Sequence, residues 1–309
     1  MIPIRDEYVL ANGLRFHIAA CGEGDELALL LHGFPESSYS WRYQLPMLAG
    51  LGYRAWAPDL RGYGGTTWLP HMRDYAMENL LEDVAQLIDA AKPSSTLLIA
   101  HDWGGIIAWY FALRRLRPLD RLVVMNLPHP GVMERAMRTR QQLARSWYVF
   151  LFQIPWLPER MIAARGYRAI EEAIRGMAVD KSRFPDEVLR VYRDNASRPG
   201  AARAMVNYYR ALVRGGGARR QRLLGYPIID TPTLMVWGEE DRALGKETTY
   251  GTGDFVSDLT IEYLPGVSHF VQQEAPDKVN DILEKWLIAP RPAAETQVPG
   301  TTVSPSSAS

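Results

Sequence analysis

The chain has 309 residues, 47% hydrophobic and 23% charged, so it can bury a sizeable core and is not a disordered chain. Its 35 basic and 35 acidic residues balance, which predicts neither a nucleic-acid partner nor attraction to an acidic membrane. The single cysteine, Cys21, excludes an internal disulfide. There is no charged-then-apolar leader and no apolar run of about 18 residues, so we expect a soluble, cytoplasmic protein.

The first part of the chain alternates short apolar runs with helical patterns. Two runs around Asn12-Gly13 indicate a β-hairpin, because this dipeptide favours the tight turn between antiparallel strands. The segments "ENLLEDVAQLIDAA" (78–91) and "GIIAWYFALRRL" (105–116) carry apolar residues at helical spacing. Four further strand-like runs begin at Leu27, Tyr53, Ser95 and Arg121. The alternation predicts a parallel sheet with helices on both faces.

The pattern changes after Asn126. Residues 131–224 carry helix-like stretches without a convincing strand and end in "RGGGARRQR" (214–222), which we interpret as a flexible or solvated loop. Strand-like runs then begin at Thr231 and Leu259, and an amphipathic helix "DKVNDILEKWLI" follows. We therefore predict an eight-stranded, mostly parallel sheet in a core of residues 1–130 and 225–289, a helical cap of residues 131–224, and a disordered tail of residues 290–309.

The run "TLLIAHDWGG" (96–105) has the strand–turn–helix form of a nucleophile elbow, with Asp102 where hydrolases usually have serine. A carboxylate with a pKa of about 3.9 is ionised at pH 7 and needs no base to activate it. Its attack on a saturated carbon gives an alkyl ester that water can cleave, whereas attack on an ester or amide would give a mixed anhydride. The elbow therefore predicts opening of an epoxide or displacement of a halide. The alternative is that Asp102 only caps the following helix.

Hydrolysis of such an ester needs a base and an oxyanion site. In hydrolases with this elbow the order is nucleophile, acid, histidine, and both Asp241 and His269 follow strand-like runs in that order. Glu239 and Glu240 compete with Asp241 for the role of the acid. Two backbone N–H groups should stabilise the oxyanion, one from Trp103 after the nucleophile and one from Phe34 in "HGFP".

Over residues 5–288 the sequence resembles the soluble epoxide hydrolases of the α/β-hydrolase fold, on "LLHGFPESSYSWRYQLPMLAGLGYRAWAPDLRGYGGT" and "AHDWGG". The resemblance implies Asp102 as nucleophile, Asp241 as acid, His269 as base, and an epoxide as the small-molecule substrate without a metal or organic cofactor. It also implies two cap tyrosines that bind the epoxide oxygen: Tyr148, before the "FQIP" segment, and Tyr209, in "NYYRA", where the adjacent Tyr208 could be confused with it. Ala100 departs from the family, which commonly has glycine there.

Other reactions and roles fit part of the pattern. A haloalkane dehalogenase would share Asp102 and His269 and would use Trp103 to hold halide, but it needs no pair of cap tyrosines and usually has Asn, Gln or Trp where Phe34 stands. A haloacid dehalogenase would need Arg next to the nucleophile. A non-enzymatic receptor on this fold would often have lost the nucleophile, the acid or the histidine. The oligomeric state, a homodimer included, stays open.

Overall fold

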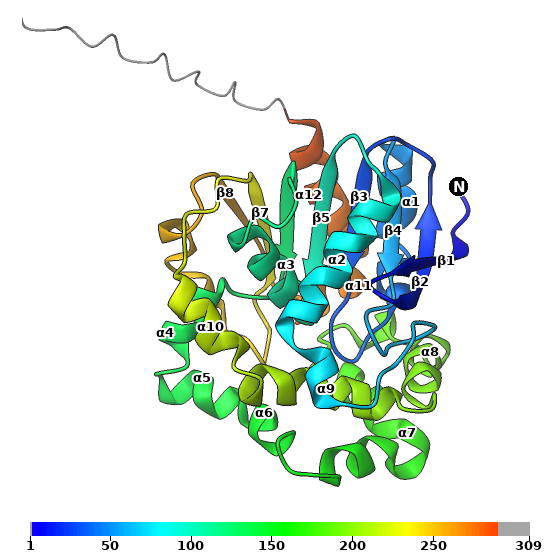
Figure 1. Cartoon of the computed structure of the whole chain (residues 1–309), viewed down its shortest axis with the longest axis vertical. Helices are drawn as coiled ribbons and strands as arrows, with labels where there is room; N and C mark the ends of the chain where they lie inside the picture. Colours follow the sequence, from blue (N-terminus) through cyan, green and yellow to red (C-terminus); the bar gives the residue numbers. More distant parts are fainter. Residues whose placement is uncertain (1, 290–309) are drawn as a thin grey trace, which may run out of the picture.

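A computed structural model describes residues 2–289, and an eight-stranded sheet lies at its centre (Figure 1). The spatial order is β1-β2-β4-β3-β5-β6-β7-β8; β2 pairs antiparallel with β1 and β4, and all other pairs are parallel. The predicted eight-stranded, mostly parallel sheet is therefore confirmed. The strands are β1 (Arg5–Ala11), β2 (Leu14–Cys21), β3 (Leu27–Leu31), β4 (Arg54–Pro58), β5 (Thr96–His101), β6 (Arg121–Met125), β7 (Thr233–Gly238) and β8 (Leu259–Leu264).

Backbone conformation and burial explain why these segments are strands. Asn12 and Gly13 have φ of 47° and 71°, the left-handed conformation that a two-residue hairpin turn between β1 and β2 requires. Every residue of β3, β5, β6 and β7 is buried, because helices cover both faces of the sheet. This burial accounts for the nearly continuous apolar runs of the central strands.

Two apolar layers hold the helices on the sheet. One layer contains side chains of α2 (Met77–Ala91) and α3 (Trp103–Leu113), and the other contains side chains of α1 (Gln44–Gly50) and α12 (Pro276–Ile288). The predicted helices at 78–91 and after the elbow are confirmed, and so is the C-terminal amphipathic helix. The remaining short elements outside the β6–β7 connection are α11 (Val271–Glu274) and the 3-10 turns Ser38–Trp41, Met72–Tyr75, Lys246–Thr249 and Thr252–Asp254.

The connection between β6 and β7 is helical and lies at the end of the sheet where α3 begins (Figure 1). Within α7, Arg165, Gly166 and Tyr167 have positive φ and divide the helix into two parts. The elements are α4 (Pro130–Ala136), α5 (Arg140–Arg145), α6 (Trp147–Leu151), α7 (Leu157–Met177), a 3-10 turn (Lys181–Arg183), α8 (Asp186–Ala196), α9 (Ala201–Arg214) and α10 (Gly217–Leu224).

The interpretation of 214–222 as a loop is wrong for most of that segment. Gly216 adopts a left-handed conformation with φ 72° after α9, and the chain then forms α10 from Gly217. Two side chains tie α10 to the core: the Arg220 guanidinium bonds the Glu78 carboxylate, and the Gln221 amide oxygen accepts from Arg114. These tertiary contacts, which the composition of the segment does not reveal, stabilise the helix.

Two sequence expectations concern chain ends and membranes. The predicted disordered tail from residue 290 lies outside the described residues. Between residues 2 and 289, no helix has both the length and the apolar character needed to cross a membrane.

The pairing of His17 with Asp59 predicts a pH-dependent contribution to stability. His17 Nδ1 lies 2.7 Å from the buried Asp59 carboxylate, and Nε2 lies 2.9 Å from Asp6. The bond to Asp59 raises the pKa of His17 above 6.5 despite partial burial, and the same pair lowers the pKa of Asp59 to about 2 although burial alone would raise it. A raised histidine pKa stabilises the folded state fully below pH 6.5, and this stabilisation is lost as pH rises through the folded-state value.

We therefore expect His17→Ala to lower the free energy of unfolding by roughly 1–3 kcal/mol at pH 6, because it leaves a buried carboxylate short of a donor, and by less at pH 9. Urea denaturation at the two pH values measures the difference. An equal loss at both would mean that the charge on His17 contributes nothing to stability.

Candidate active site

Asp102 stands at a strained turn between β5 and α3. Its φ of 47° and ψ of −116° are unusual for a residue with a side chain. A Cβ added to Gly33 would lie 2.4 Å from the Asp102 Cβ, and one added to Gly104 would lie 2.2 Å from the Leu31 carbonyl oxygen. The turn therefore needs these glycines, whereas the methyl group of Ala100 is accommodated in the buried interior of β5.

The Asp102 carboxylate does not cap the helix that follows it. Its Oδ1 accepts a hydrogen bond from the Phe34 backbone N–H at 2.8 Å, and Oδ2 lies 3.6 Å from His269 Nε2. It accepts no capping bond from α3. Trp103 is the first residue of α3, so its N–H belongs to the free donors of a helix N-terminus. The geometry supports a carboxylate available to a ligand and does not support the helix-cap alternative.

His269 lies between two carboxylates from different strand ends. Its Nδ1 is 2.6 Å from Asp241 Oδ2, on the side opposite Asp102. Asp241 is in turn fixed through Oδ1, which accepts the backbone N–H groups of Ala243 and Leu244 at 2.8 and 2.9 Å. The two competing acids point elsewhere, since Glu239 bonds Lys246 and Glu240 is exposed.

The charges in this cluster stabilise one another. Burial would lower the pKa of His269, but Asp241 and Asp102 together raise it well above 6.5. Burial would likewise raise the pKa of Asp102, but the bond to His269 and the nearby histidine charges lower it below 3.8. The cluster therefore pairs a carboxylate of lowered pKa, Asp102, with an imidazole of raised pKa, His269.

Sequence reasoning missed three residues that hold this cluster together. Asn126, directly after β6, donates from Nδ2 to Asp241 Oδ2 at 2.7 Å and accepts from the Gly238 N–H at 2.9 Å. His101, directly before Asp102, contacts Glu36 Oε2 through Nδ1 at 2.8 Å and the His269 carbonyl through Nε2 at 2.9 Å. The sequence does show that each of these polar residues adjoins a buried strand or the HGFP turn. Their hydrogen-bond partners are distant in the sequence, so the contacts could not be predicted from it.

The two predicted tyrosines approach Asp102 from the β6–β7 connection. Tyr148 on α6 and Tyr209 on α9 both line the same cavity as Asp102, and their ring centroids are 5.9 Å apart at 80°. Burial, and secondarily the Asp102 charge, raises the pKa of both phenols above 10. Both hydroxyls therefore keep their protons and can donate hydrogen bonds at neutral pH.

Tyr208, adjacent in the sequence, has a different environment. Its hydroxyl donates to the Arg61 carbonyl at 2.9 Å, and its buried ring packs on Tyr63 and Tyr75. Tyr208 does not line the cavity, whereas Tyr209 does. The geometry thus separates the two neighbours and favours Tyr209 for contact with a ligand.

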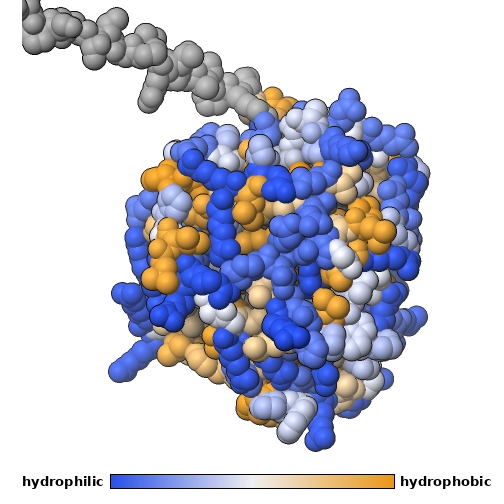
Figure 2. Space-filling view, viewed as in Figure 1, coloured by the Kyte–Doolittle hydropathy of each residue, from blue (hydrophilic) through white to orange (hydrophobic). Residues whose placement is uncertain are grey.

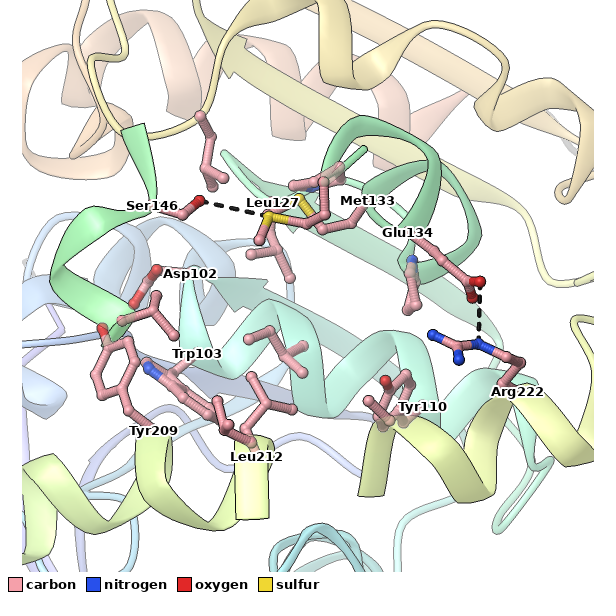
Figure 3. Close-up of a pocket in the computed structure, with 18 of the residues that line it drawn as sticks. Asp102, Trp103, Tyr110, Leu127, Met133, Glu134, Ser146, Tyr209, Leu212 and Arg222 are labelled. Atoms are coloured by element: carbon pink, nitrogen blue, oxygen red, sulfur yellow. Dashed lines mark hydrogen bonds and ion pairs between the residues drawn. The ribbon is translucent and has the colours of Figure 1, made fainter. Parts of the chain in front are cut away.

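The cavity has a volume of about 660 Å³ and extends away from Asp102 along a mainly apolar path (Figure 3). Leu127, Met133 and Leu212 lie between the two ends. Asp102, Trp103 and Tyr209 lie at one end, and the Glu134–Arg222 pair, joined at 3.0 Å, lies at the other. Within residues 2–289, no three His, Cys, Asp or Glu side chains are grouped so that they could hold a metal ion.

Known proteins resemble this chain over most of its length. The α/β hydrolase fold family matches residues 28–276. The AB hydrolase superfamily protein YfhM of Bacillus subtilis is 34% identical over 290 residues, covering 93% of this chain and 99% of the relative. Epoxide hydrolase 3 of Xenopus tropicalis is 38% identical over 283 residues, covering 89% and 75%. An inhibitor complex of a Bacillus megaterium epoxide hydrolase aligns with a TM-score of 0.84 and 29% identity, covering 91% of this chain and 99% of that one.

Proposed function

The chain belongs to the epoxide hydrolases of the α/β-hydrolase fold, and from this premise we propose that it converts epoxides to vicinal diols through a covalent ester on Asp102. Hydrolysis of an epoxide ether bond is the activity for which several of its relatives are named. The ester route is supported by the position of Asp102, which lines the same cavity as two phenols and whose carboxylate lies next to His269.

In the first step the epoxide lies between Asp102 and the two tyrosines. Asp102 Oδ2 forms a bond to one ring carbon while the C–O bond of the ring breaks. The Tyr148 and Tyr209 hydroxyls donate to the leaving oxygen, which takes a proton from one of them. The proton that His269 releases once Asp102 has lost its charge restores that tyrosine. Oδ1, held by the Phe34 N–H at 2.8 Å, becomes the carbonyl oxygen of the ester.

In the second step His269 removes a proton from water, which attacks the Asp102 carboxyl carbon. The N–H groups of Phe34 and Trp103 stabilise the oxyanion on Oδ1. The bond from that carbon to the alkyl oxygen then breaks, and the alkyl oxygen takes the remaining proton of the attacking water. The diol leaves with the former Oδ2, and the water oxygen stays in Asp102. Asp241 orients His269 and stabilises its positive charge.

Esterification itself would switch His269 into its base form. In the free protein both Asp102 and Asp241 raise the pKa of His269. An esterified Asp102 carries no charge, so burial, which lowers the pKa, is then opposed by Asp241 alone. His269 would therefore lose its proton more readily when an ester is ready for hydrolysis.

Residues 131–224 would act as a cap over this chemistry. They supply Tyr148, Tyr209 and much of the apolar cavity wall, while the core supplies Asp102, Asp241 and His269. Such a wall would exclude bulk water and bind the apolar part of the substrate.

One observation favours this function over dehalogenation: the phenols of Tyr148 and Tyr209, which burial keeps protonated, line the same cavity as Asp102. An alkoxide is a poor leaving group and needs such donors, whereas a halide leaves readily. The test is a parallel assay of epoxides and haloalkanes that measures diol and halide release. We expect diol from epoxides and no enzymatic halide release; the reverse would identify a dehalogenase.

Tyr148→Phe should slow ester formation from an epoxide by about 100-fold, because one of two donors to the leaving oxygen is lost. Tyr209→Phe should behave similarly. Rapid-quench detection of the Asp102 ester by mass spectrometry measures the step directly. Tyr208→Phe is the matched control, since it removes a hydroxyl bonded to the Arg61 carbonyl and should leave the rate of the folded protein nearly unchanged. If Tyr148→Phe formed the ester as fast as this control, the Tyr148 phenol would have no role in ester formation.

A further inference from the structure

Glu274 is a buried carboxylate that joins two separate parts of the chain. It is 4% exposed. Its Oε2 accepts the Ser268 backbone N–H at 3.0 Å and the Ser268 hydroxyl. Its Oε1 accepts the backbone N–H groups of Val179 and Asp180 at 2.9 and 2.7 Å. All four donors are neutral, so hydrogen bonds rather than an ion pair hold this carboxylate.

The two ends of this junction have different origins. Ser268 directly precedes His269, whereas Val179 and Asp180 follow α7 in the connection between β6 and β7. A second contact runs in parallel, since the neighbouring Gln273 accepts the hydroxyl of Tyr192 on α8 at 2.6 Å. The loop that carries His269 is therefore fixed against the helical connection through α11.

We propose that Glu274 is a positioning residue that holds His269 for the water-activating step by coupling its loop to the docked cap. The inference rests on the proposed function. For the water-activating step, His269 Nδ1 must stay bonded to Asp241 Oδ2, 2.6 Å away, while Nε2 faces Asp102. Glu274 fixes the backbone of Ser268, the residue directly before His269. Withdrawal of residues 179–180 would remove half of the bonds of Glu274 and leave the His269 loop less restrained.

Glu274 should affect only one of the two chemical steps. Ester formation uses Asp102, Tyr148 and Tyr209, which lie on the β5–α3 turn, α6 and α9. None of them is bonded to Glu274. Ester hydrolysis depends on His269, whose loop Glu274 holds.

The test is Glu274→Gln. The amide nitrogen of Gln cannot accept a hydrogen bond, so one of the two donor pairs would lose its acceptor. We expect kcat for diol formation to fall by about 10- to 100-fold and KM to fall in parallel, so that kcat/KM, which reports ester formation, stays within about threefold of the wild type. The Asp102 ester should accumulate during turnover. Glu284→Gln, on the exposed side of α12, is the control and should change neither constant.

A merely structural role would give another pattern. A fall in kcat/KM as large as the fall in kcat, at unchanged KM, would overturn the inference, because it would reflect loss of folded protein or damage to both steps. If Glu274→Gln does not fold, Ser268→Ala, which removes one of the four donors, is the second test. It should lower kcat and KM in parallel by a smaller factor and leave kcat/KM nearly unchanged. A wild type that forms neither ester nor diol would instead refute the proposed function.

A different observation concerns the outer surface of α5, α6 and the start of α7. Figure 2 shows hydrophobic surface among hydrophilic side chains along the lower edge of the molecule, where α5 and α6 lie in Figure 1. Contiguous exposed apolar surface is uncommon on proteins that bind nothing there. The large apolar residues that form this α5–α7 patch, each more than 40% exposed, are Leu143, Trp147, Phe150, Ile154, Trp156, Leu157 and Met161.

Residues 138–168, which carry the α5–α7 patch, include six arginines and one acid, and three of the arginines pair with carboxylates outside this segment. Within the described residues, Arg140, Arg160 and Arg214 have no carboxylate partner, and Glu159, the one acid between residues 138 and 168, is bound to Arg210. The neutral net charge of the whole chain hides this local excess. A two-fold contact with a second copy would bring two such arginine-rich segments together, and the one acid of each segment is already bound to Arg210.

The geometry points to an anionic lipid surface as the partner of the α5–α7 patch. Exposed tryptophan and phenylalanine with flanking arginines are what the headgroup region of an anionic bilayer accommodates. Trp147 and Phe150 flank Tyr148, whose side chain lines the cavity on the same short helix. Docking there would bring the cavity close to apolar compounds dissolved in the membrane.

Sedimentation with phosphatidylglycerol or phosphatidylcholine vesicles tests this docking. We expect binding to the anionic vesicles at low salt, at least tenfold weaker binding to phosphatidylcholine, and about fivefold loss for each of Arg140→Glu and Arg160→Glu. A Phe150→Ser/Trp156→Ser variant should lose binding and keep its activity on a water-soluble epoxide. Leu223→Ser/Leu224→Ser, exposed on α10 outside the patch, is the control.

Failure of the wild type to bind anionic vesicles would overturn the docking proposal. So would equal binding by wild type and Phe150→Ser/Trp156→Ser. A wild-type dimer that this variant converts to monomers, without vesicle binding, would instead assign the α5–α7 patch to contact between copies of the chain.

Discussion

An Asp102→Ala variant should lose at least about four orders of magnitude in the rate of diol formation, because the nucleophile is removed and no other carboxylate can take its place. Asp241 is directed away by its bonds to His269, Asn126 and two backbone N–H groups. Diol formation by chromatography measures the loss, and circular dichroism checks that the variant is folded. A residual rate within tenfold of the wild type would mean that water attacks the epoxide directly.

Isotope labelling tests the same residue without changing it. In heavy-oxygen water under single turnover, the label should enter the Asp102 carboxylate and be absent from the first diol. The reason is that water attacks the carboxyl carbon of the ester while the diol leaves with an oxygen of Asp102. Mass spectrometry of the peptide that contains Asp102, and of the diol, provides both readings. Label in the first-turnover diol would contradict the ester route.

The sheet was largely predictable from the sequence, because its central strands β3, β5, β6 and β7 are buried on both faces and read as nearly unbroken apolar runs. The elbow was predictable for a related reason: small residues are required where Gly33 and Gly104 face backbone or Asp102 atoms at close range. A turn that requires small residues at fixed positions can be recognised from the sequence of that turn. The segment 214–222 was misread because Arg220 and Gln221 stabilise α10 through partners more than a hundred residues away.

The same distinction applies to the candidate site. Asp102, Asp241 and His269 could be predicted because each follows a strand, and parallel strands end at one edge of the sheet. Asn126 and Glu36 could not, since their roles depend on contacts across 115 and 65 residues of sequence. The choice between Tyr208 and Tyr209 depends on which face of α9 turns toward the cavity, which only the packing of α9 on the core decides.

His269→Gln should convert the enzyme into a trap for its own intermediate. Ester formation should proceed within about tenfold of the wild-type rate, because Asp102 is ionised and the tyrosines are intact. Ester hydrolysis should fall by about three orders of magnitude or more, since no side chain is left to remove a proton from water. Incubation with excess epoxide should add the mass of one substrate to each protein molecule.

The pH dependence of the wild type provides an independent check on the role of His269. Ester hydrolysis needs neutral His269, so its rate should fall as pH drops through the pKa that His269 has in the ester form. That pKa should lie below the raised value of the free protein, because an esterified Asp102 no longer stabilises the imidazolium. Ester formation does not use the imidazole as a base and should not fall over the same range. Stopped-flow measurement of each step against pH separates the two. If the rate of ester hydrolysis did not fall at low pH, the base would be another group. The same conclusion would follow if His269→Gln turned over at the wild-type rate.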